Sequence, residues 1–240
     1  MKKAIIIGAT SGIGRALAIE LSQRGYALGL AGRREELLQA LQGELERESV
    51  CKMLDIAQPE DAVLRLHTLI AELGGMDLLV IAAGIGDGLG EELKWEKEAA
   101  VLQTNVIGFA RLAVEGYNLF ARQQGGQLVG ISSIAGIRGS RSSPGYSASK
   151  AFMTNYLEAL RWRAVHDGNH IVVTDIRPGF IATPMTEGQS GMFWVAPVDK
   201  AAHQIADAIQ RRLPVAYITH RWALIASLLR HIPDWVGRRF

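Results

Sequence analysis

Tyr146 and Lys150 stand in the stretch Y-S-A-S-K, just before a sequence of helical character, AFMTNYLEALRWRAV. Residues four apart lie on one face of an α-helix, so a phenol and an ammonium group are expected side by side. A free tyrosine has a pKa of about 10, and a neighbouring cation lowers that pKa because it favours the tyrosinate form. The pair therefore indicates a phenol that can donate and accept a proton. The alternative is an ordinary pair of exposed side chains.

A glycine-rich turn, G-A-T-S-G-I-G (8–14), follows the apolar run AIII (4–7). Glycines permit a sharp turn and a close approach of the backbone to a ligand. A helix that begins here offers unpaired N–H groups and a partial positive charge, which suit a pyrophosphate. The spacing departs from the general G-x-G-x-x-G pattern, so a tight turn without a ligand is the alternative. The candidate dinucleotide contacts are Gly8, Thr10, Ser11, Gly12, Ile13 and Gly14.

The end of the next apolar run, ALGLA (27–31), bears on the choice of cofactor. Chains that bind NAD usually carry an Asp or Glu about twenty residues after the glycine turn, where it holds the ribose 2′-hydroxyl. Here no carboxylate sits at the end of the run, and Gly32 and Arg33 take that place. A guanidinium suits a 2′-phosphate. The sequence therefore favours NADPH over NADH, with Arg34 and Arg15 as helpers. Arg33 as a solvated residue at a helix start is the alternative.

Short apolar runs alternate with helical stretches along the whole chain. Strand runs that are apolar on both faces and separated by helices indicate a parallel sheet covered on both sides. We predict a single α/β domain over 1–240, a doubly wound Rossmann fold of seven parallel strands, with ligands beyond the carboxyl ends of the strands. Strands are predicted at 4–7, 27–31, 50–54, 77–84 (in its first part), 126–132, 170–176 and 215–219, and helices at 15–24, 35–48, 59–73, 96–122 (broken near Gly108 or Gly116), from about 146, and at 199–211.

The composition and charge of the chain exclude several classes of protein. Of the 240 residues 48% are apolar, which supports a large core, and the formal net charge of +2 is too small to argue for nucleic acid. Cys51 is the only cysteine, so an internal disulfide is excluded and a reducing compartment is expected. No run approaches the ~18 apolar residues of a membrane span, and the run at 4–7 is too short for a signal peptide. We expect a cytoplasmic protein and predict no metal site.

From Lys3 to about Pro184 the chain resembles the short-chain dehydrogenase/reductase family. The resemblance rests on the motifs in their order: G-A-T-S-G-I-G (8–14), Asp55, A-A-G (82–84), Asn105, I-S-S-I-A-G (131–136), Y-S-A-S-K (146–150) and R-P-G-F-I-A-T-P (177–184). Each motif alone is weakly specific, whereas their spacing together is highly specific, above all the serine thirteen residues before the tyrosine. The resemblance implies a catalytic tetrad of Asn105, Ser133, Tyr146 and Lys150, and a homodimer or homotetramer.

The tetrad residues have separate expected roles. Tyr146 would be the acid for reduction and the base for oxidation. The Ser133 hydroxyl would bind and orient the substrate oxygen, and the thirteen-residue spacing favours it over Ser132. Ser147 is nearer to Tyr146 in the sequence, but we expect it to be exposed on the helix. The resemblance adds that Lys150 holds the nicotinamide ribose and that Asn105 helps to position a water. A helix-interior asparagine satisfied by backbone groups is the alternative for Asn105.

The remaining candidate cofactor contacts adjoin strand ends. Asp55 is either an adenine contact or a cap at a helix entry. Pro178 and Gly179 fix a turn, and the resemblance implies that the backbone at Ile181 and the side chain of Thr183 hold the nicotinamide carboxamide or the phosphates. A purely structural turn is the alternative. The other candidates are Ile56, Ala83 and Gly84; here the family often has N-N-A-G, whereas this chain has I-A-A-G (81–84).

Two segments outside the motifs bear on the substrate. The loop 184–197 carries glycines, methionines, Phe193 and Trp194, and could close over a substrate with apolar surface; the two aromatics could instead be core or interface residues. The opposite wall is expected at 85–93. The segment 220–240 is amphipathic with flanking arginines, which is compatible with an anionic membrane, a neighbouring subunit or the chain's own cleft. Base rates favour packing within a protein assembly.

The sequence thus predicts an NADP(H)-dependent oxidoreductase that interconverts a small-molecule carbonyl and an alcohol. A catalytically silent dinucleotide-binding sensor or scaffold of the same fold is the alternative from another class, and the complete tetrad argues against it. A nucleotide-sugar epimerase is a third interpretation. About 56 residues follow Pro184, which fits the short form of the fold better than a form with a long substrate domain.

Overall fold

Seven strands form one parallel sheet in the computed structural model, which describes residues 1–86, 92–188, 191–233 and 235. The strand order is β3-β2-β1-β4-β5-β6-β7, so the predicted doubly wound sheet is confirmed. The strands are β1 (Lys3–Ile7), β2 (Ala27–Gly32), β3 (Ser49–Met53), β4 (Leu78–Ile81), β5 (Gly126–Ile131), β6 (Ile171–Pro178) and β7 (Val215–Ile218).

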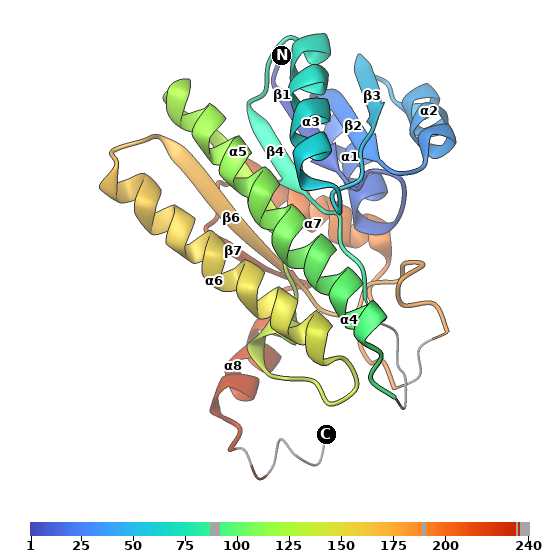
Figure 1. The fold of residues 1–240 in the computed structure, drawn as a ribbon, viewed down its shortest axis with the longest axis vertical. Helices are drawn as coiled ribbons and strands as arrows, with labels where there is room; N and C mark the ends of the chain where they lie inside the picture. The colour runs from blue at the N-terminus through green and yellow to red at the C-terminus, as the bar shows by residue number, and fades with distance from the viewer. Residues whose placement is uncertain (87–91, 189–190, 234, 236–240) are drawn as a thin grey trace.

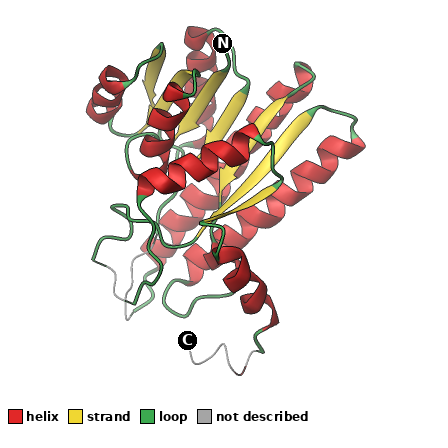
Figure 2. Ribbon diagram, turned by 180° about the vertical axis from the view of Figure 1, so that it is seen from behind, coloured by secondary structure: helices red, strands yellow, loops and turns green. Residues whose placement is uncertain are grey.

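Helices cover both faces of the sheet (Figures 1 and 2). In β1, Ile6 packs into the core on one face, and Ile5 and Ile7 pack into the core on the other. This is why the strand reads as a continuous apolar run instead of an alternating one. Helices α1 (Gly12–Gln23), α2 (Glu35–Glu44) and α7 (Val198–Gln210) cover the first face, and α3 (Pro59–Leu73), α5 (Phe109–Arg122) and α6 (Pro144–His166) cover the second.

The region predicted as one helix over 96–122 contains a π-helical stretch. Helix α4 (Trp95–Leu102) runs into this stretch, η1 (Gln103–Gly108), and α5 follows it. The predicted break near Gly108 falls at the end of η1, where a Cβ would overlap the carbonyl of Ile56. No break occurs at Gly116, which lies inside α5. Asn105 belongs to the π-helical stretch, and such stretches are frequent at functional sites.

The winding of the chain reverses at β1. This strand pairs with β2 on one side and with β4 on the other, and Ile7 lies opposite both Ala31 and Ile81. A crevice therefore opens beyond the carboxyl ends of these strands, where ligands of doubly wound sheets bind. A further helix, α8 (Trp222–His231), follows β7, while α2 ends at Glu44, four residues before the predicted end. Within the described ranges no helix is both long and apolar enough to cross a membrane.

Candidate active site

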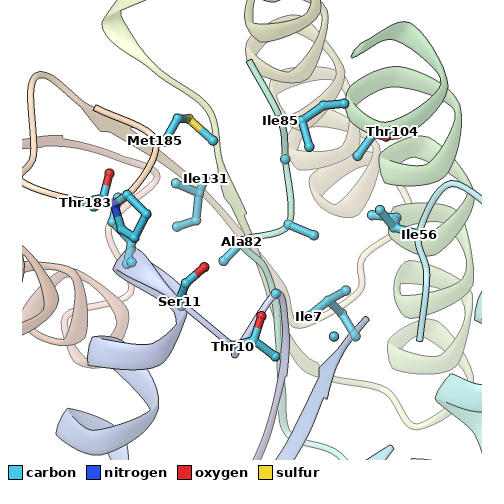
Figure 3. Close-up of a pocket in the computed structure, with 18 of the residues that line it drawn as sticks. Ile7, Thr10, Ser11, Ile56, Ala82, Ile85, Thr104, Ile131, Thr183 and Met185 are labelled. Atoms are coloured by element: carbon cyan, nitrogen blue, oxygen red, sulfur yellow. The ribbon is translucent and has the colours of Figure 1, made fainter. Parts of the chain in front are cut away.

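A cleft with a volume of about 240 Å³ lies beyond the carboxyl ends of the strands. Figure 3 shows Thr183 and Met185 on one side of it and Ile85 and Thr104 on the other. The cleft brings together motifs that are far apart in the sequence. Two of the residues predicted for the site, Asn105 and the helper Arg15, are not part of the cleft lining. The predicted residues that line the cleft are Gly8, Thr10, Ser11, Gly12, Ile13, Gly14, Arg33, Arg34, Asp55, Ile56, Ala83, Gly84, Ser133, Tyr146, Lys150, Pro178, Gly179, Ile181 and Thr183.

The glycine turn packs closely against neighbouring backbone because its glycines lack side chains. Gly8 has a φ of 96°, and a Cβ there would lie 2.6 Å from the backbone nitrogen of Ala83. A Cβ on Gly14 would overlap the carbonyl oxygen of Gly8. The turn leads directly into α1, whose N-terminal N–H groups and partial positive charge favour an anion. These residues fit the pyrophosphate of a dinucleotide.

The two arginines after β2 sit at the edge of the same cleft. Arg34 donates a hydrogen bond to the Thr10 hydroxyl at 2.9 Å, which ties the start of α2 to the glycine turn. Arg33 lines the cleft and is exposed. Arg15, the other predicted helper, instead forms a 2.6 Å ion pair with Glu44 and does not line the cleft.

Asp55 combines parts of its two expected interpretations. Its carboxylate accepts a hydrogen bond from the backbone N–H of Ala57 at 3.0 Å, which turns the chain toward α3. It also lines the cleft beyond β3, where an adenine contact was expected. The carboxylate therefore shapes the turn and borders the cleft at once.

The Lys150 ammonium is buried behind the cleft floor. Its Nζ donates to the carbonyl oxygen of Ile131 at 2.9 Å and lies 5.6 Å from the centroid of the Tyr146 ring. Burial lowers the pKa of Lys150 from 10.5 to about 8, because the charged form loses its hydration, and the Asp175 carboxylate offsets part of that lowering. Helix α6 places both side chains on one face, as the four-residue spacing predicts.

The two serines at the end of β5 have different environments. The Ser132 hydroxyl is buried, donates to the Asp175 carboxylate and contacts the carbonyl of Ile176 at 3.1 Å. Asp175 is paired in turn with Arg177 at 2.6 Å. The Ser133 hydroxyl, in contrast, accepts from Ala135 N–H at 3.1 Å and has a long, 3.4 Å contact to a carbonyl. Ser133 is therefore the serine whose hydroxyl is more readily available to a ligand.

A third serine was placed wrongly from the sequence. Ser147 follows Tyr146 and was expected on an exposed part of the helix, yet it is buried. Its hydroxyl donates to the carbonyl of Pro144 at 3.0 Å and accepts from the backbone N–H of Ser140 at 3.1 Å. These bonds fix the start of α6, a local role that the residue's type does not reveal.

Asn105 is fully buried, and its amide is bonded on both sides. Its oxygen accepts from Ile85 N–H at 2.9 Å, and its nitrogen donates to the carbonyl of Ile85 at 2.8 Å and to the Ser149 hydroxyl at 3.1 Å. The side chain thus joins η1, α6 and the wall after β4. Its predicted part in positioning a water stays a prediction.

The turn after β6 is closed by a residue that the sequence interpretation missed. The Thr186 hydroxyl donates to the carbonyl of Ile181 at 2.7 Å and accepts from Thr183 N–H at 3.0 Å. The chain then returns along Ile181, which forms a parallel bridge with Ala196. The segment 184–197 is therefore anchored at both ends beside the cleft; residues 189 and 190 lie outside the described part.

Aromatic side chains gather beside this loop. Phe193 and Trp194 are half-exposed, at 49% and 44%, so neither is a core residue. Both pack against Trp222 of α8, with ring centroids 5.1 Å and 5.8 Å away. The first turn of α8 thus packs against the loop 184–197 of the same chain. Residues 234 and 236–240 of the C-terminal segment and 87–91 of the other expected wall lie outside the described part.

Comparison with known proteins identifies the family. The family described as short chain dehydrogenase matches residues 2–192. The chain is 38% identical over 189 residues to an uncharacterized oxidoreductase of Myxococcus xanthus (strain DK1622), covering 77% of this chain and 74% of the relative. It is 33% identical over 187 residues to the human 3-oxoacyl-[acyl-carrier-protein] reductase, covering 78% of each. The chain belongs to the short-chain dehydrogenase family.

Similarity extends across the whole chain for other proteins. An uncharacterized oxidoreductase of Mycobacterium tuberculosis (strain CDC 1551 / Oshkosh) is 30% identical over 251 aligned positions, covering all of this chain and 97% of the relative. A solved short-chain dehydrogenase from Sphingobium yanoikuyae in complex with NADPH superposes with a TM-score of 0.81 at 23% identity, covering 98% of this chain and 97% of that one. The latter likeness confirms the fold of this short-chain dehydrogenase.

The sequence interpretation missed several lining residues of the dehydrogenase cleft. Most of them adjoin a motif residue at the carboxyl end of a strand, and that adjacency was the signal available. They are Ile7, Gly32, Leu54, Ala82, Thr104, Ile131 and Ser132. Four further lining residues, Ile85, Pro184, Met185 and Thr186, fall in the two segments that were expected to border the substrate. Among the described residues, no group of three or more His, Cys, Asp or Glu side chains could hold a metal ion.

Proposed function

We propose that this short-chain dehydrogenase is an NADP(H)-dependent oxidoreductase that interconverts a carbonyl and an alcohol, with Tyr146 as the general acid and base. The observation that carries the proposal is the placement of Tyr146, Lys150 and Ser133 in one cleft with the glycine turn. When bound, a nicotinamide dinucleotide supplies or accepts the hydride. The protein has to supply the proton, orient the substrate and exclude water from the cleft.

The proton would be held at the phenolic oxygen of Tyr146. The Lys150 ammonium, 5.6 Å from the ring centroid, favours the tyrosinate and so eases release of that proton. The carbonyl of Ile131 holds the ammonium at 2.9 Å and fixes its position. The Ser133 hydroxyl would donate to the substrate oxygen and stabilise the negative charge that develops on it.

Preference for NADPH is supported by the charges at the end of β2. Arg33 and Arg34 border the cleft, and β2 itself ends in Gly32 without a carboxylate. Arg34 is already bonded to Thr10, which leaves Arg33 as the proposed partner of a 2′-phosphate. The fold neighbour from Sphingobium yanoikuyae was solved with NADPH, in agreement with this preference.

The substrate is proposed to be a small molecule with apolar surface. Met185 lines the cleft, and the half-exposed Phe193 and Trp194 stand in the same loop. From the family resemblance we further propose a cytoplasmic homodimer or homotetramer formed by the single domain over 1–240. A silent dinucleotide-binding protein would share the cleft but would not need the arrangement of Tyr146, Lys150 and Ser133.

The test is a panel of ketones, aldehydes and alcohols of graded apolar size, assayed by nicotinamide absorbance with NADPH, NADH and their oxidised forms. Turnover with at least one carbonyl, faster with NADPH than with NADH, is expected. Binding of NADPH measured by calorimetry without turnover of any member would favour the silent protein instead.

A further inference from the structure

Helix α8 contacts two segments beside the cleft, the loop after β6 and the segment after β5. Its first residue, Trp222, is 1% exposed and packs among three rings of the loop after β6. Those rings belong to Phe180, Phe193 and Trp194, with centroids 5.5, 5.1 and 5.8 Å from Trp222. The described residues give the Trp222 indole N–H no hydrogen-bond partner, so packing holds the ring in place.

The cleft wall is shaped to receive the Trp222 ring. Gly179 lines the cleft, and a Cβ at this position would overlap the indole. Trp222 therefore lies directly behind the turn that carries Ile181 and Thr183. The preceding residue strengthens the contact, because Arg221 donates to the carbonyl of Trp194 at 2.8 Å and its guanidinium lies 4.9 Å from that ring.

The far end of α8 is held by the segment that follows β5. The Arg138 side chain donates to the carbonyl of Leu229 at 2.9 Å and to the carbonyl of Ile232. Leu229 lies in the last turn of α8, whose carbonyls lack partners within the helix, and Ile232 is the residue that follows the helix. Arg138 directly follows the short helix η2 (Ile134–Ile137), whose N-terminal cap is Ser133.

Contacts thus connect the loop 184–197 through α8 to the turn that begins at Ser133. The dinucleotide end of the cleft is held by other contacts, since Gly8 N–H bonds to the carbonyl of Ala31 at 2.8 Å and Arg34 bonds to Thr10. A change in the seating of α8 would consequently alter the substrate end and leave the glycine turn in place.

We propose that α8 acts as a brace that sets the position of the loop 184–197 relative to Ser133, with Trp222 and Arg138 as positioning residues for the carbonyl substrate. The expected effect of the brace on turnover depends on the proposed function, whereas its expected effect on the loop does not. Neither residue touches the reacting atoms; each acts through the segment that it holds. Small displacements of this kind can cost up to about a hundredfold in rate.

The kinetic test compares Arg138→Gln with Arg141→Gln. Arg141 is an exposed arginine of the same loop that takes no part in the Arg138 bonds. With the best carbonyl of the panel, Arg138→Gln should raise KM about tenfold and change the calorimetric Kd for NADPH less than about twofold. Arg141→Gln should match the wild type. Equal KM values for the two variants, or an equal loss of NADPH affinity and substrate affinity, would overturn the brace.

A second measurement does not depend on turnover. Chymotrypsin can cut the loop at Phe193 and Trp194, and its rate reports how firmly the loop is held. Trp222→Leu and Arg138→Gln should speed this cleavage several-fold, and Trp222→Phe should lie between them and the wild type, because it keeps an aromatic ring. If Trp222→Leu does not fold, as judged by circular dichroism, Arg138→Gln and Trp222→Phe decide.

The two proposals fail in different ways. In one outcome, the wild type turns over no carbonyl while Arg138→Gln still speeds cleavage of the loop. That result would refute the proposed oxidoreductase activity and support the brace. A wild-type enzyme that is active, with loop cleavage and KM unchanged in Arg138→Gln and in Trp222→Phe, keeps the oxidoreductase and refutes the brace.

Discussion

The Nζ of Lys150 lies 5.6 Å from the centroid of the Tyr146 ring, and both residues line one cleft. The ammonium reaches this position from inside the protein, because its bond to the carbonyl of Ile131 draws it toward the end of β5. A cation held in this way cannot swing out into solvent. Its influence on the phenol is therefore fixed by the fold, in contrast to that of a lysine on an exposed helix face.

Replacing Tyr146 by Phe should abolish turnover while NADPH still binds. The variant removes only the hydroxyl, so the cleft and the seat of Lys150 are retained. Loss of a general acid costs typically about 10²–10⁴-fold. We expect kcat to fall by at least about 10²-fold. The calorimetric Kd for NADPH should change less than about threefold. Unchanged turnover would show that the proton comes from another group.

The buried lysine should make stability depend on pH in a defined window. Burial lowers the pKa of Lys150 to about 8, whereas the unfolded lysine stays near 10.5. Between these values the unfolded chain binds more protons, so the free energy of unfolding rises as the pH increases. Below pH 8 the cost of the buried charge is present in full, on the order of 3 kcal/mol, and above 10.5 it disappears.

The measurement uses Tyr146→Phe as the reference, so that the phenol does not titrate. Urea unfolding of Tyr146→Phe and of Tyr146→Phe/Lys150→Met is compared at about pH 7 and about pH 10. The protein that keeps the lysine should gain stability relative to the Met variant as the pH rises. A difference that stays constant between the two pH values would mean that Lys150 titrates normally.

Arg33→Ala should weaken NADPH far more than NADH. A charge-assisted hydrogen bond to a phosphate is worth about 1.5–3 kcal/mol, so the Kd for NADPH should rise about tenfold to a hundredfold. The Kd for NADH should change less than about threefold. Arg15→Ala is the matched control, because Arg15 carries the same charge but is paired with Glu44 away from the cleft. Equal losses for the two cofactors in Arg33→Ala would remove its proposed role.

The apolar runs predicted the sheet because each strand is buried on both faces, and the motifs then marked the carboxyl ends of those strands. Local spacing also predicted the shared helix face of Tyr146 and Lys150. What the sequence could not predict depends on contacts between distant segments. The bonds of Asn105 to Ile85 and of Ser132 to Asp175 join elements 20 and 43 residues apart. The seat of Trp222 behind Gly179 is likewise a tertiary contact that no periodicity reveals.

Helix ends gave a second kind of error. The apolar spacing over 35–48 continues past Glu44, where α2 ends. The region 96–122 has helical spacing throughout, yet η1 interrupts it where Gly108 packs against the backbone of Ile56. Periodicity reports which face is apolar, and it does not report where a neighbouring segment requires the backbone to widen or stop.

Ser133→Ala and Ser132→Ala should separate catalysis from stability, although the two serines are adjacent. Among the described residues, the Ser133 hydroxyl bonds to Ala135 N–H and has a long contact to the carbonyl of Pro178. Its loss should therefore lower kcat about a hundredfold with little change in Tm.

The Ser132 hydroxyl instead donates to a fully buried carboxylate, Asp175, and its removal should lower the free energy of unfolding by about 1–3 kcal/mol. The kcat of Ser132→Ala should stay within about threefold of the wild type, since the Arg177 partner keeps Asp175 in place. Steady-state kinetics and urea unfolding on both variants give the comparison. If Ser132→Ala lost the activity and Ser133→Ala lost only stability, the catalytic hydroxyl would be assigned to the wrong serine.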